Sequence, residues 1–206
     1  MDLKNKIVLI TGAGKGAGRA LAEALAERGA FVAANDISPI NVEEVVSRIN
    51  ARGDKARAYI EDIAKKVGAQ ALVKSVEDDL GGIDILVNHA AVEPHTPLLN
   101  MDEWDWHRTL DVNLTGAFLM MQSVGRVMRA KGQGAILNIV TGAGRGVEKD
   151  AGAYLSSMAG LVALSRQADL ELRPHGIRVY AVENSVDVVK DVMTTLEAWR
   201  RNEGIA

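Results

Sequence analysis

The stretch KIVLITGAGKGAG, residues 6–18, decides the fold of this 206-residue chain. A short, mostly apolar run at 6–10 predicts a buried strand. From 17 to 28, apolar side chains recur every three or four positions, which predicts a helix. A buried strand that passes through a glycine-rich turn directly into a helix is typical of a βαβ unit that binds a dinucleotide.

The three glycines of this turn have separate expected roles. Gly12 permits the tight turn, Gly16 lets a pyrophosphate approach the backbone, and Gly18 allows the helix to pack closely on the sheet. The helix N-terminus adds N–H donors and the positive end of the helix dipole. The spacing is GxxxGxG rather than GxGxxG, so the interpretation depends on the strand before the turn and the helix after it.

Two charged residues bear on the choice of dinucleotide. Asp36 closes the second predicted strand, where a carboxylate accepts hydrogen bonds from the adenosine ribose hydroxyls and repels a 2′-phosphate. Lys15 in the glycine turn argues the other way, because a cation there can meet that phosphate. NAD is therefore the favoured cofactor, and NADP is the alternative.

The rest of the chain alternates short strands with helices, which is the pattern of parallel βαβ units. We predict an α/β fold, a Rossmann-type doubly wound parallel sheet with helices on both faces. No linker or low-complexity segment divides the chain, so residues 1–206 are expected to form a single domain. The further strands are predicted at 31–35, 56–60, 84–88, 135–140 and 177–182, and the further helices at 40–51, 65–80, 102–131 with a break near Leu110, and 152–173.

Composition excludes several classes of function. The chain has no cysteine and therefore neither a disulfide nor a thiol nucleophile. A formal net charge of -3 gives no reason to expect nucleic acid or an anionic membrane as a partner. No apolar segment approaches the ~20 residues of a membrane span, and the first residues do not resemble a signal peptide, which together point to the cytoplasm. The four histidines lack metal-ligand spacing, so no metal site is expected.

Several motifs resemble those of the short-chain dehydrogenase/reductase family. TGAGKGAG at 11–18 is similar to the family's TGxxxGxG loop, and NHAA at 88–91 stands where NNAG is usual. Asp62 and Ile63 resemble its adenine-contacting pair after the third strand. The resemblance covers nearly the whole chain. It implies an oxidoreductase that transfers hydride between NAD(P) and a small-molecule carbonyl or alcohol.

The resemblance also assigns candidate site residues. Asn113 in DVNLTGAF matches the family's catalytic asparagine, and Tyr154 lies thirteen residues after Thr141, the spacing of its catalytic serine and tyrosine. Tyr154 would exchange the proton, Thr141 would polarise the carbonyl, and Asn113 would organise a water that relays the proton. The candidate dinucleotide contacts, from the turn and the resemblance together, are Gly12, Lys15, Gly16, Ala17, Gly18, Asp36, Ile37, Asp62, Ile63, Asn88, Ala90 and Tyr154.

One departure from the family bears directly on catalysis. The family places a lysine four residues after the tyrosine, where it lowers the tyrosine pKa and holds the nicotinamide ribose, but this chain has Met158. Methionine carries no charge and donates no hydrogen bond. At pH 7 only about one free tyrosine in a thousand is phenolate. Alcohol oxidation, which needs that base, is therefore expected to suffer more than carbonyl reduction.

Other departures surround the expected site. His89 and Ala91 replace residues of NNAG, and Asn184-Ser185 replaces the Pro-Gly that usually follows the sixth strand. The chain ends at Ala206, whereas family members normally continue through a helical pair that covers the substrate and through a seventh strand. With that last strand missing, the strand at 177–182 is expected to be an exposed edge.

A second glycine string, TGAGRG at 141–146, follows the fifth predicted strand. The next residues, VEKDAGAY, form a loop with charged residues rather than a helix, so these glycines do not lie at a helix N-terminus. We therefore expect one phosphate site, at the first glycine turn, and we expect the second string to face the substrate.

Three functions stay open from the sequence alone. The first is an oxidoreductase of reduced or altered activity, which the retained Tyr154, Thr141 and Asn113 favour. The second is a catalytically silent dinucleotide-binding protein that serves as a regulatory or structural subunit. The third is a degenerate chain that folds but binds nothing well. By the resemblance, the helices at 102–131 and 153–173 would form the interface of a homodimer or homotetramer.

Overall fold

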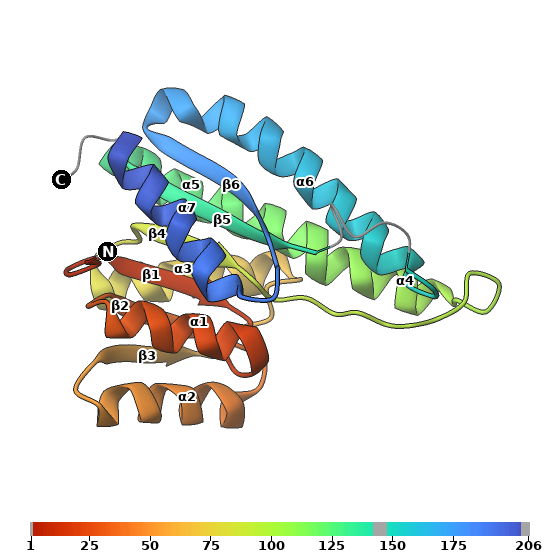
Figure 1. Ribbon diagram of the computed structural model, residues 1–206, viewed down its shortest axis with the longest axis horizontal. Coiled ribbons are helices and arrows are strands. Elements are labelled where there is room, and N and C mark those ends of the chain that lie inside the picture. Colours follow the sequence, from red (N-terminus) through yellow and green to blue (C-terminus); the bar gives the residue numbers. More distant parts are fainter. Residues whose placement is uncertain (1, 142–147, 203–206) are drawn as a thin grey trace.

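Six parallel strands form one sheet in the order β3-β2-β1-β4-β5-β6 in the computed structural model, which describes residues 2–141 and 148–202 (Figure 1). The chain moves outward from β1 to β3 and then returns to the other side of β1. The order reverses between β1 and β4, and open sheets of this kind bind ligands at the carboxyl ends of the strands beside such a reversal. The strands are β1 (Ile7–Thr11), β2 (Phe31–Asn35), β3 (Lys55–Tyr59), β4 (Ile85–Asn88), β5 (Gly134–Val140) and β6 (Ile177–Glu183).

Helices cover both faces of the sheet, as the doubly wound prediction requires (Figure 1). One face packs against α1 (Gly16–Glu27), α2 (Pro39–Ala51) and α7 (Val188–Asn202). The other face packs against α3 (Lys66–Leu80), α5 (Ala117–Lys131) and α6 (Gly152–Leu172). The predicted fold class is confirmed.

Strand β1 shows why the strands are apolar runs rather than alternating patterns. Val8 and Ile10 pack into the core on the α1 side, whereas Leu9 packs into the core on the α3 side. All three side chains are fully buried, because successive residues of a strand point to opposite faces and both faces are covered. Each such burial contributes about 1.5–3 kcal/mol, so the central strands stabilise the fold strongly.

Helix α7 was not predicted from the sequence. Its buried side chains include Val188, Val192, Leu196 and Trp199, which recur at three- and four-residue spacing along one face. They join the core of the α1 face, where α7 contacts α1, β5 and β6. Strand β6 lies at one edge of the sheet, as expected, with α7 packed against it.

The predicted helix at 102–131 consists of three segments. Helix α4 (Glu103–Leu110) passes without a loop into the π-helical turn η1 (Asp111–Gly116), and α5 follows directly. The break expected near Leu110 is therefore a change of helical pitch. Turns of this kind are rare and occur often at functional sites.

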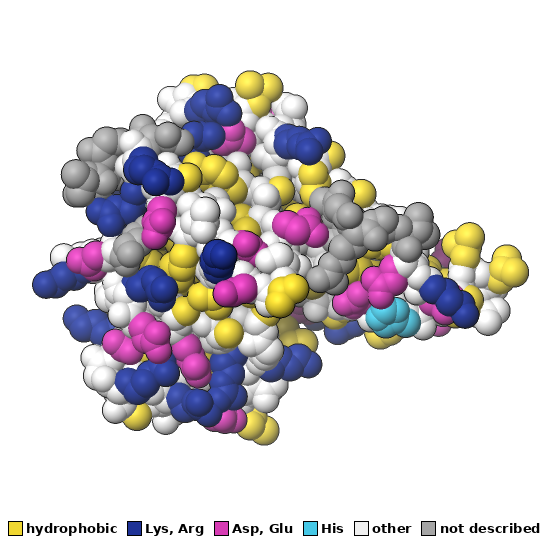
Figure 2. Space-filling model, viewed as in Figure 1, with side chains coloured by type: hydrophobic (Ala, Val, Ile, Leu, Met, Phe, Trp, Pro, Cys, Tyr) yellow, Lys and Arg dark blue, Asp and Glu magenta, His cyan; other side chains and the backbone are white. Residues whose placement is uncertain are grey.

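Charged side chains of both signs are interspersed on the face shown in Figure 2. No helix within 2–141 or 148–202 combines the length and the apolar character that a membrane crossing requires.

Asp169 of α6 anchors this helix to β6. Its carboxylate accepts hydrogen bonds from Arg178 Nε and Val179 N, each at 2.9 Å, and from Arg173. Burial alone would raise the pKa of this carboxyl, but the two arginines and the Val179 N–H outweigh burial and lower the pKa to about 2. The folded-state pKa is below the ordinary value of 3.8, so the stabilisation is present above that value and is lost as the pH falls towards 2.

The Asp169→Asn variant is therefore expected to lose about 2 kcal/mol of unfolding free energy at pH 7, the size typical of hydrogen bonds to a charged group. Near pH 2 the difference from wild type is expected to vanish. Urea unfolding at both pH values measures it. Asp78→Asn is the control, because the Lys74–Asp78 pair is exposed and surface ion pairs contribute little to stability. Equal losses for the two variants at pH 7 would contradict the assigned anchor.

Candidate active site

A cavity of about 520 Å³ opens at the carboxyl ends of the strands, beside the reversal between β1 and β4. It brings together residues from the glycine turn, from the loops after β2, β3 and β4, and from α6. The predicted site residues among its walls are Gly12, Lys15, Asp36, Ile37, Asp62, Ile63, Ala90, Thr141 and Tyr154. Gly16, Ala17, Gly18, Asn88 and Asn113 do not line it.

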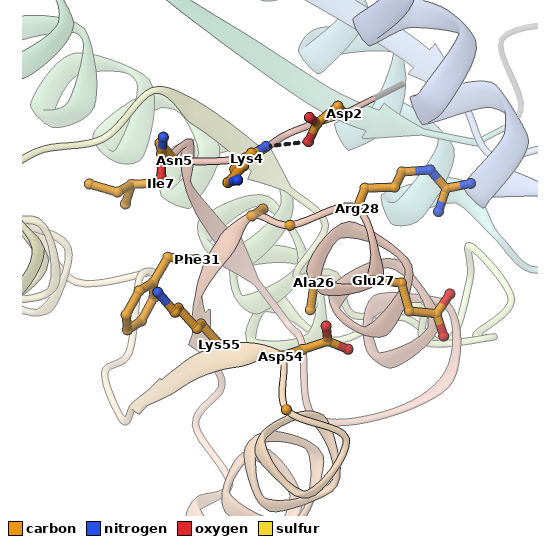
Figure 3. Close-up of a pocket in the computed structure, with 13 residues that line it drawn as sticks. Asp2, Lys4, Asn5, Ile7, Ala26, Glu27, Arg28, Phe31, Asp54 and Lys55 are labelled. Carbon is orange, nitrogen blue, oxygen red and sulfur yellow. Dashed lines mark hydrogen bonds between the residues drawn. The ribbon is translucent and has the colours of Figure 1, made fainter.

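A larger cavity, of about 850 Å³, lies at the opposite edge of the sheet, where the strands begin (Figure 3). Its walls come from the end of α1, from the segment between α2 and β3, and from residues such as Lys4, Arg28 and Lys55. In Figure 3 the backbone N–H of Lys4 donates to Asp2 Oδ1, at 2.8 Å. None of the predicted site residues lines this cavity. The candidate site is therefore the smaller cavity, since ligands of doubly wound sheets bind at the carboxyl ends.

The glycine turn is shaped by close backbone contacts. Gly12 has φ +68°, and a Cβ added there would lie 2.7 Å from Ala90 Cα. A Cβ added at Gly18 would lie 2.0 Å from the Gly12 carbonyl oxygen. Gly18 therefore permits close packing, as predicted, but the nearest contact is the turn itself rather than the sheet. Gly16 has φ +55° and open space where a side chain would be, so its backbone is accessible.

The first turn of α1 is suited to an anion. Lys15 stands at the N-cap and makes no side-chain capping hydrogen bond within the described part of the chain. The first N–H groups of a helix have no partner inside the helix, and a bound phosphate satisfies them. Exposed Lys15 also lines the cavity.

Asp36 connects the end of β2 to the glycine turn. Its Oδ2 accepts a hydrogen bond from Gly14 N, at 2.9 Å, and its Oδ1 accepts one from Ser38 N, at 3.0 Å. The residue is half-buried and lines the cavity. These bonds hold the carboxylate beside the glycine turn, which is the position that contact with the adenosine ribose requires.

The wall beyond Asp36 forms the expected adenine end. Asp62 accepts a hydrogen bond from Ala64 N, at 3.1 Å, and pairs with Lys65 at 3.3 Å, while Ile63 is buried behind it. Among the cavity residues that the sequence analysis did not predict are Arg108 and Val112. They are four residues apart, the spacing that places two side chains on the same face of a helix.

Asn88 is buried at the end of β4 rather than in the cavity wall. Its Nδ2 donates to Asn138 Oδ1 at 2.8 Å, and Asn138 in turn donates to Ser165 Oγ at 2.8 Å. These buried amides join β4, β5 and α6. A direct contact between Asn88 and a dinucleotide stays a prediction.

The expected reaction end of the cavity is lined by Thr141, Tyr154 and Met158. Tyr154 and Met158 lie one turn apart on α6 and are almost fully buried, with 6% and 4% exposure. Met158 therefore occupies the cavity wall beside Tyr154. Asn184 also lines this cavity, just after β6. Residues 142–147, which include the second glycine string, lie outside the described residues.

Asn113 makes hydrogen bonds that its predicted role did not include. Within η1 its Oδ1 accepts from Val92 N at 2.8 Å, and its Nδ2 donates to Val92 O at 2.9 Å and to Ser157 Oγ at 3.0 Å. Ser157 donates to the Tyr154 carbonyl at 2.6 Å. Both amide hydrogens of Asn113 are thus used to hold the loop after β4 against α6. The organisation of a relay water stays a prediction.

Glu93, His95 and Glu148 are the only three described residues with ligand atoms grouped closely enough to hold a metal ion, within 4.8 Å of one another. The sequence did not predict this group, because the three residues come from two separate segments. All are exposed, and an exposed group of this kind does not by itself make a metal site.

Comparison with known proteins adds sequence relatives to what the geometry of the site indicates. The sequence model of the family described as short chain dehydrogenase matches residues 6–198. The chain is 37% identical over 187 residues to galactitol 2-dehydrogenase of Agrobacterium fabrum, covering 90% of this chain and 72% of that protein. It is 35% identical over 206 residues to D-threitol dehydrogenase of Mycolicibacterium smegmatis, covering 99% of this chain and 77% of that protein.

Solved structures agree in fold. NAD⁺-bound xylitol dehydrogenase superposes with a TM-score of 0.85 at 33% identity, over 89% of this chain and 71% of that one. A metagenomic short-chain oxidoreductase in complex with NADP superposes with a TM-score of 0.88 at 30% identity, over 95% of this chain and 91% of that one. The fold, the cavity and these matches lead to one conclusion: the chain belongs to the short-chain dehydrogenase family.

Proposed function

We propose that this protein uses NADH to reduce a carbonyl group of a small molecule, with Tyr154 as the proton donor. As a family member the chain is an NAD(P)-dependent oxidoreductase, which transfers hydride between nicotinamide and a carbonyl or alcohol substrate. The observation that carries the finer proposal is the single cavity that joins the glycine turn and Asp36 to Thr141 and Tyr154.

The residues of the cavity fit a nicotinamide dinucleotide. The uncapped first turn of α1 and the open backbone at Gly16 would receive the pyrophosphate, and Asp36 would accept hydrogen bonds from the adenosine ribose. Asp62, Ile63 and Ala90 would surround the adenine. When bound, the nicotinamide supplies the hydride for reduction.

The chain's own residues then carry out the proton transfer. The Tyr154 hydroxyl donates a proton to the oxygen on which negative charge develops. The Thr141 hydroxyl polarises the same carbonyl. Asn113 and Ser157 hold the turn of α6 that carries Tyr154. Because Met158 supplies no positive charge to stabilise a phenolate, reduction is favoured and alcohol oxidation improves as the pH rises.

A titration that follows NADH fluorescence tests the function, together with a panel of ketones derived from polyols, because several relatives are named as polyol dehydrogenases. Micromolar NADH binding with measurable ketone reduction supports the proposal. Binding without reduction of any ketone would leave a catalytically silent subunit. Absence of NADH binding would overturn the proposal.

We also propose NAD rather than NADP as the cofactor, on the strength of Asp36. The Asp36→Ser variant is expected to bind NADH about tenfold more weakly, since it loses a charge-assisted hydrogen bond, and to bind NADPH more tightly, since the repulsion is removed. Titrations with both dinucleotides measure the change. Asp54→Ser, at the opposite edge of the sheet, is the matched control and should change neither affinity. A preference of wild type for NADPH would contradict the assignment.

A homodimer or homotetramer is proposed through α5 and α6. An apolar groove of about 280 Å³ lies between these helices, lined by Phe118, Met121 and Leu164 among others, and Phe118 is 41% exposed. Phe118→Arg is expected to shift the sedimentation equilibrium towards monomer, whereas Ile40→Arg, at an exposed position on α2, is expected to leave it unchanged. A wild-type protein that stays monomeric at all concentrations would contradict the proposal. The cytoplasmic location stays a prediction.

A further inference from the structure

His89 directly follows β4 and lies against the glycine turn. Thr11 and Asn88 are paired in the β1–β4 register, so His89 stands opposite the first residue of the turn. The Thr11 hydroxyl oxygen accepts hydrogen bonds from the backbone of His89, at 3.1 Å, and of Ala90, at 3.2 Å. The backbone at His89 is therefore fixed to the end of β1, and its side chain has little freedom to leave the turn.

The imidazole fills the space next to Gly18, in the first turn of α1. A Cβ added at Gly18 would lie 2.8 Å from His89 Nδ1 and 2.0 Å from the Gly12 carbonyl oxygen. The imidazole and the glycine turn thus both pack against the start of α1 at Gly18. Nδ1 is buried and has no hydrogen-bond partner of standard geometry among the described residues. The residue nevertheless lines the cavity.

The surroundings of the ring favour its neutral form. Burial lowers the pKa of His89, and the nearby Gly12 backbone and the charge of Asp36 oppose this effect only in part. A neutral planar ring can pack against a glycine without a counter-ion. Its packing, rather than its charge, is what it contributes to the turn.

We propose that His89 is a positioning residue for the dinucleotide. Its planar side chain, with Nδ1 packed beside the contact between the Gly12 carbonyl and Gly18, holds the glycine turn in place against the first N–H groups of α1. Those N–H groups are the ones assigned to the pyrophosphate. The inference rests on the proposed dinucleotide site and adds a residue that neither the motif nor the family resemblance assigned to it.

The test compares the affinities of two probes, NADH and adenosine. Adenosine lacks the pyrophosphate. Its affinity is measured by displacement of NADH. His89→Ala is expected to weaken NADH binding about tenfold, because a misplacement of ~1 Å is costly, while adenosine affinity changes less than about twofold. His89→Asn keeps a planar group with a δ nitrogen and is expected to stay within about threefold of wild type. His107→Ala is the control, since His107 is exposed on α4.

A purely structural role would lower the thermal midpoint of His89→Ala without separating the two probes. Equal NADH affinity of His89→Ala and wild type, equal weakening of NADH and adenosine, or failure of His89→Asn to restore affinity would each overturn the inference. If His89→Ala does not fold, His89→Thr, which also lacks a δ nitrogen, takes its place with the same expectations. Absence of NADH binding in wild type would overturn the proposed function, and the inference with it.

Discussion

Replacement of Met158 by lysine is expected to raise the rate of alcohol oxidation at neutral pH by up to about a thousandfold, and to raise ketone reduction by a smaller factor. Met158 lies one turn after Tyr154 in the cavity wall, where an ammonium group would stabilise the phenolate. A shift of three pKa units corresponds to about 4 kcal/mol, and each ~1.4 kcal/mol is tenfold in rate. Steady-state rates with NAD and a secondary alcohol, measured from pH 6 to 10, test this expectation.

Two variants separate charge from packing in this experiment. Met158→Leu keeps the apolar volume and is expected to leave the rates close to those of wild type. The double variant Met158→Lys with Tyr154→Phe is expected to lose the gain, because the lysine then has no phenol to act on. Absence of turnover both before and after the lysine is introduced would refute the assigned role of Tyr154.

Substitution of alanine for Gly18 is expected to weaken NADH binding by about a hundredfold. The new Cβ would lie 2.0 Å from the Gly12 carbonyl oxygen, so the turn must move away from the first turn of α1. Overpacking of this kind also costs about 1–3 kcal/mol of stability. Calorimetry measures the second effect and fluorescence titration the first, which keeps the two apart.

Gly53→Ala is the matched control for this substitution. Gly53 has φ +87° with open space around it, so alanine there strains the backbone without a clash. This control is expected to lose about 1 kcal/mol of stability and to keep its NADH affinity. Unchanged NADH affinity in Gly18→Ala would show that the turn does not receive the pyrophosphate.

The sheet was predictable because its strands are buried on both faces. Runs such as KIVLI cannot be mistaken for amphipathic helices when glycine or charged residues bound them, and the predicted strands agree with the observed ones to within one residue at each end. Helix α7 was missed although its apolar spacing is visible. The π-helical turn was not predicted, because α4, which precedes it, buries only Thr109 and so has no apolar face against which the change of phase could be detected.

The site was predictable where a motif fixes the backbone. It was less predictable where the hydrogen-bond partners of a side chain depend on the folded surroundings. The glycine turn and Asp36 follow from strand ends and a helix start, and Tyr154 follows from the family resemblance; Gly12, Lys15, Asp36 and Tyr154 all line one cavity. Asn88 and Asn113 point into buried hydrogen-bond networks instead, because a short polar side chain takes whichever partners its final surroundings supply. The burial of His89 was likewise not predicted, since residues that follow a strand are ordinarily exposed.

The π-helical turn also fixes the rotation of α4 relative to α5. A turn with one residue more than the α-helical pitch shifts every preceding side chain by roughly 100° about the helix axis, the angle between successive residues of an α-helix. Val112 and Arg108 line the cavity, while Met120 and Val124 of α5 face the core. If the same residues of Asp111–Gly116 were wound as a regular α-helix, the two segments would rotate by that angle relative to each other. Arg108 and Val112 would then turn away from the cleft while Met120 and Val124 still faced the core.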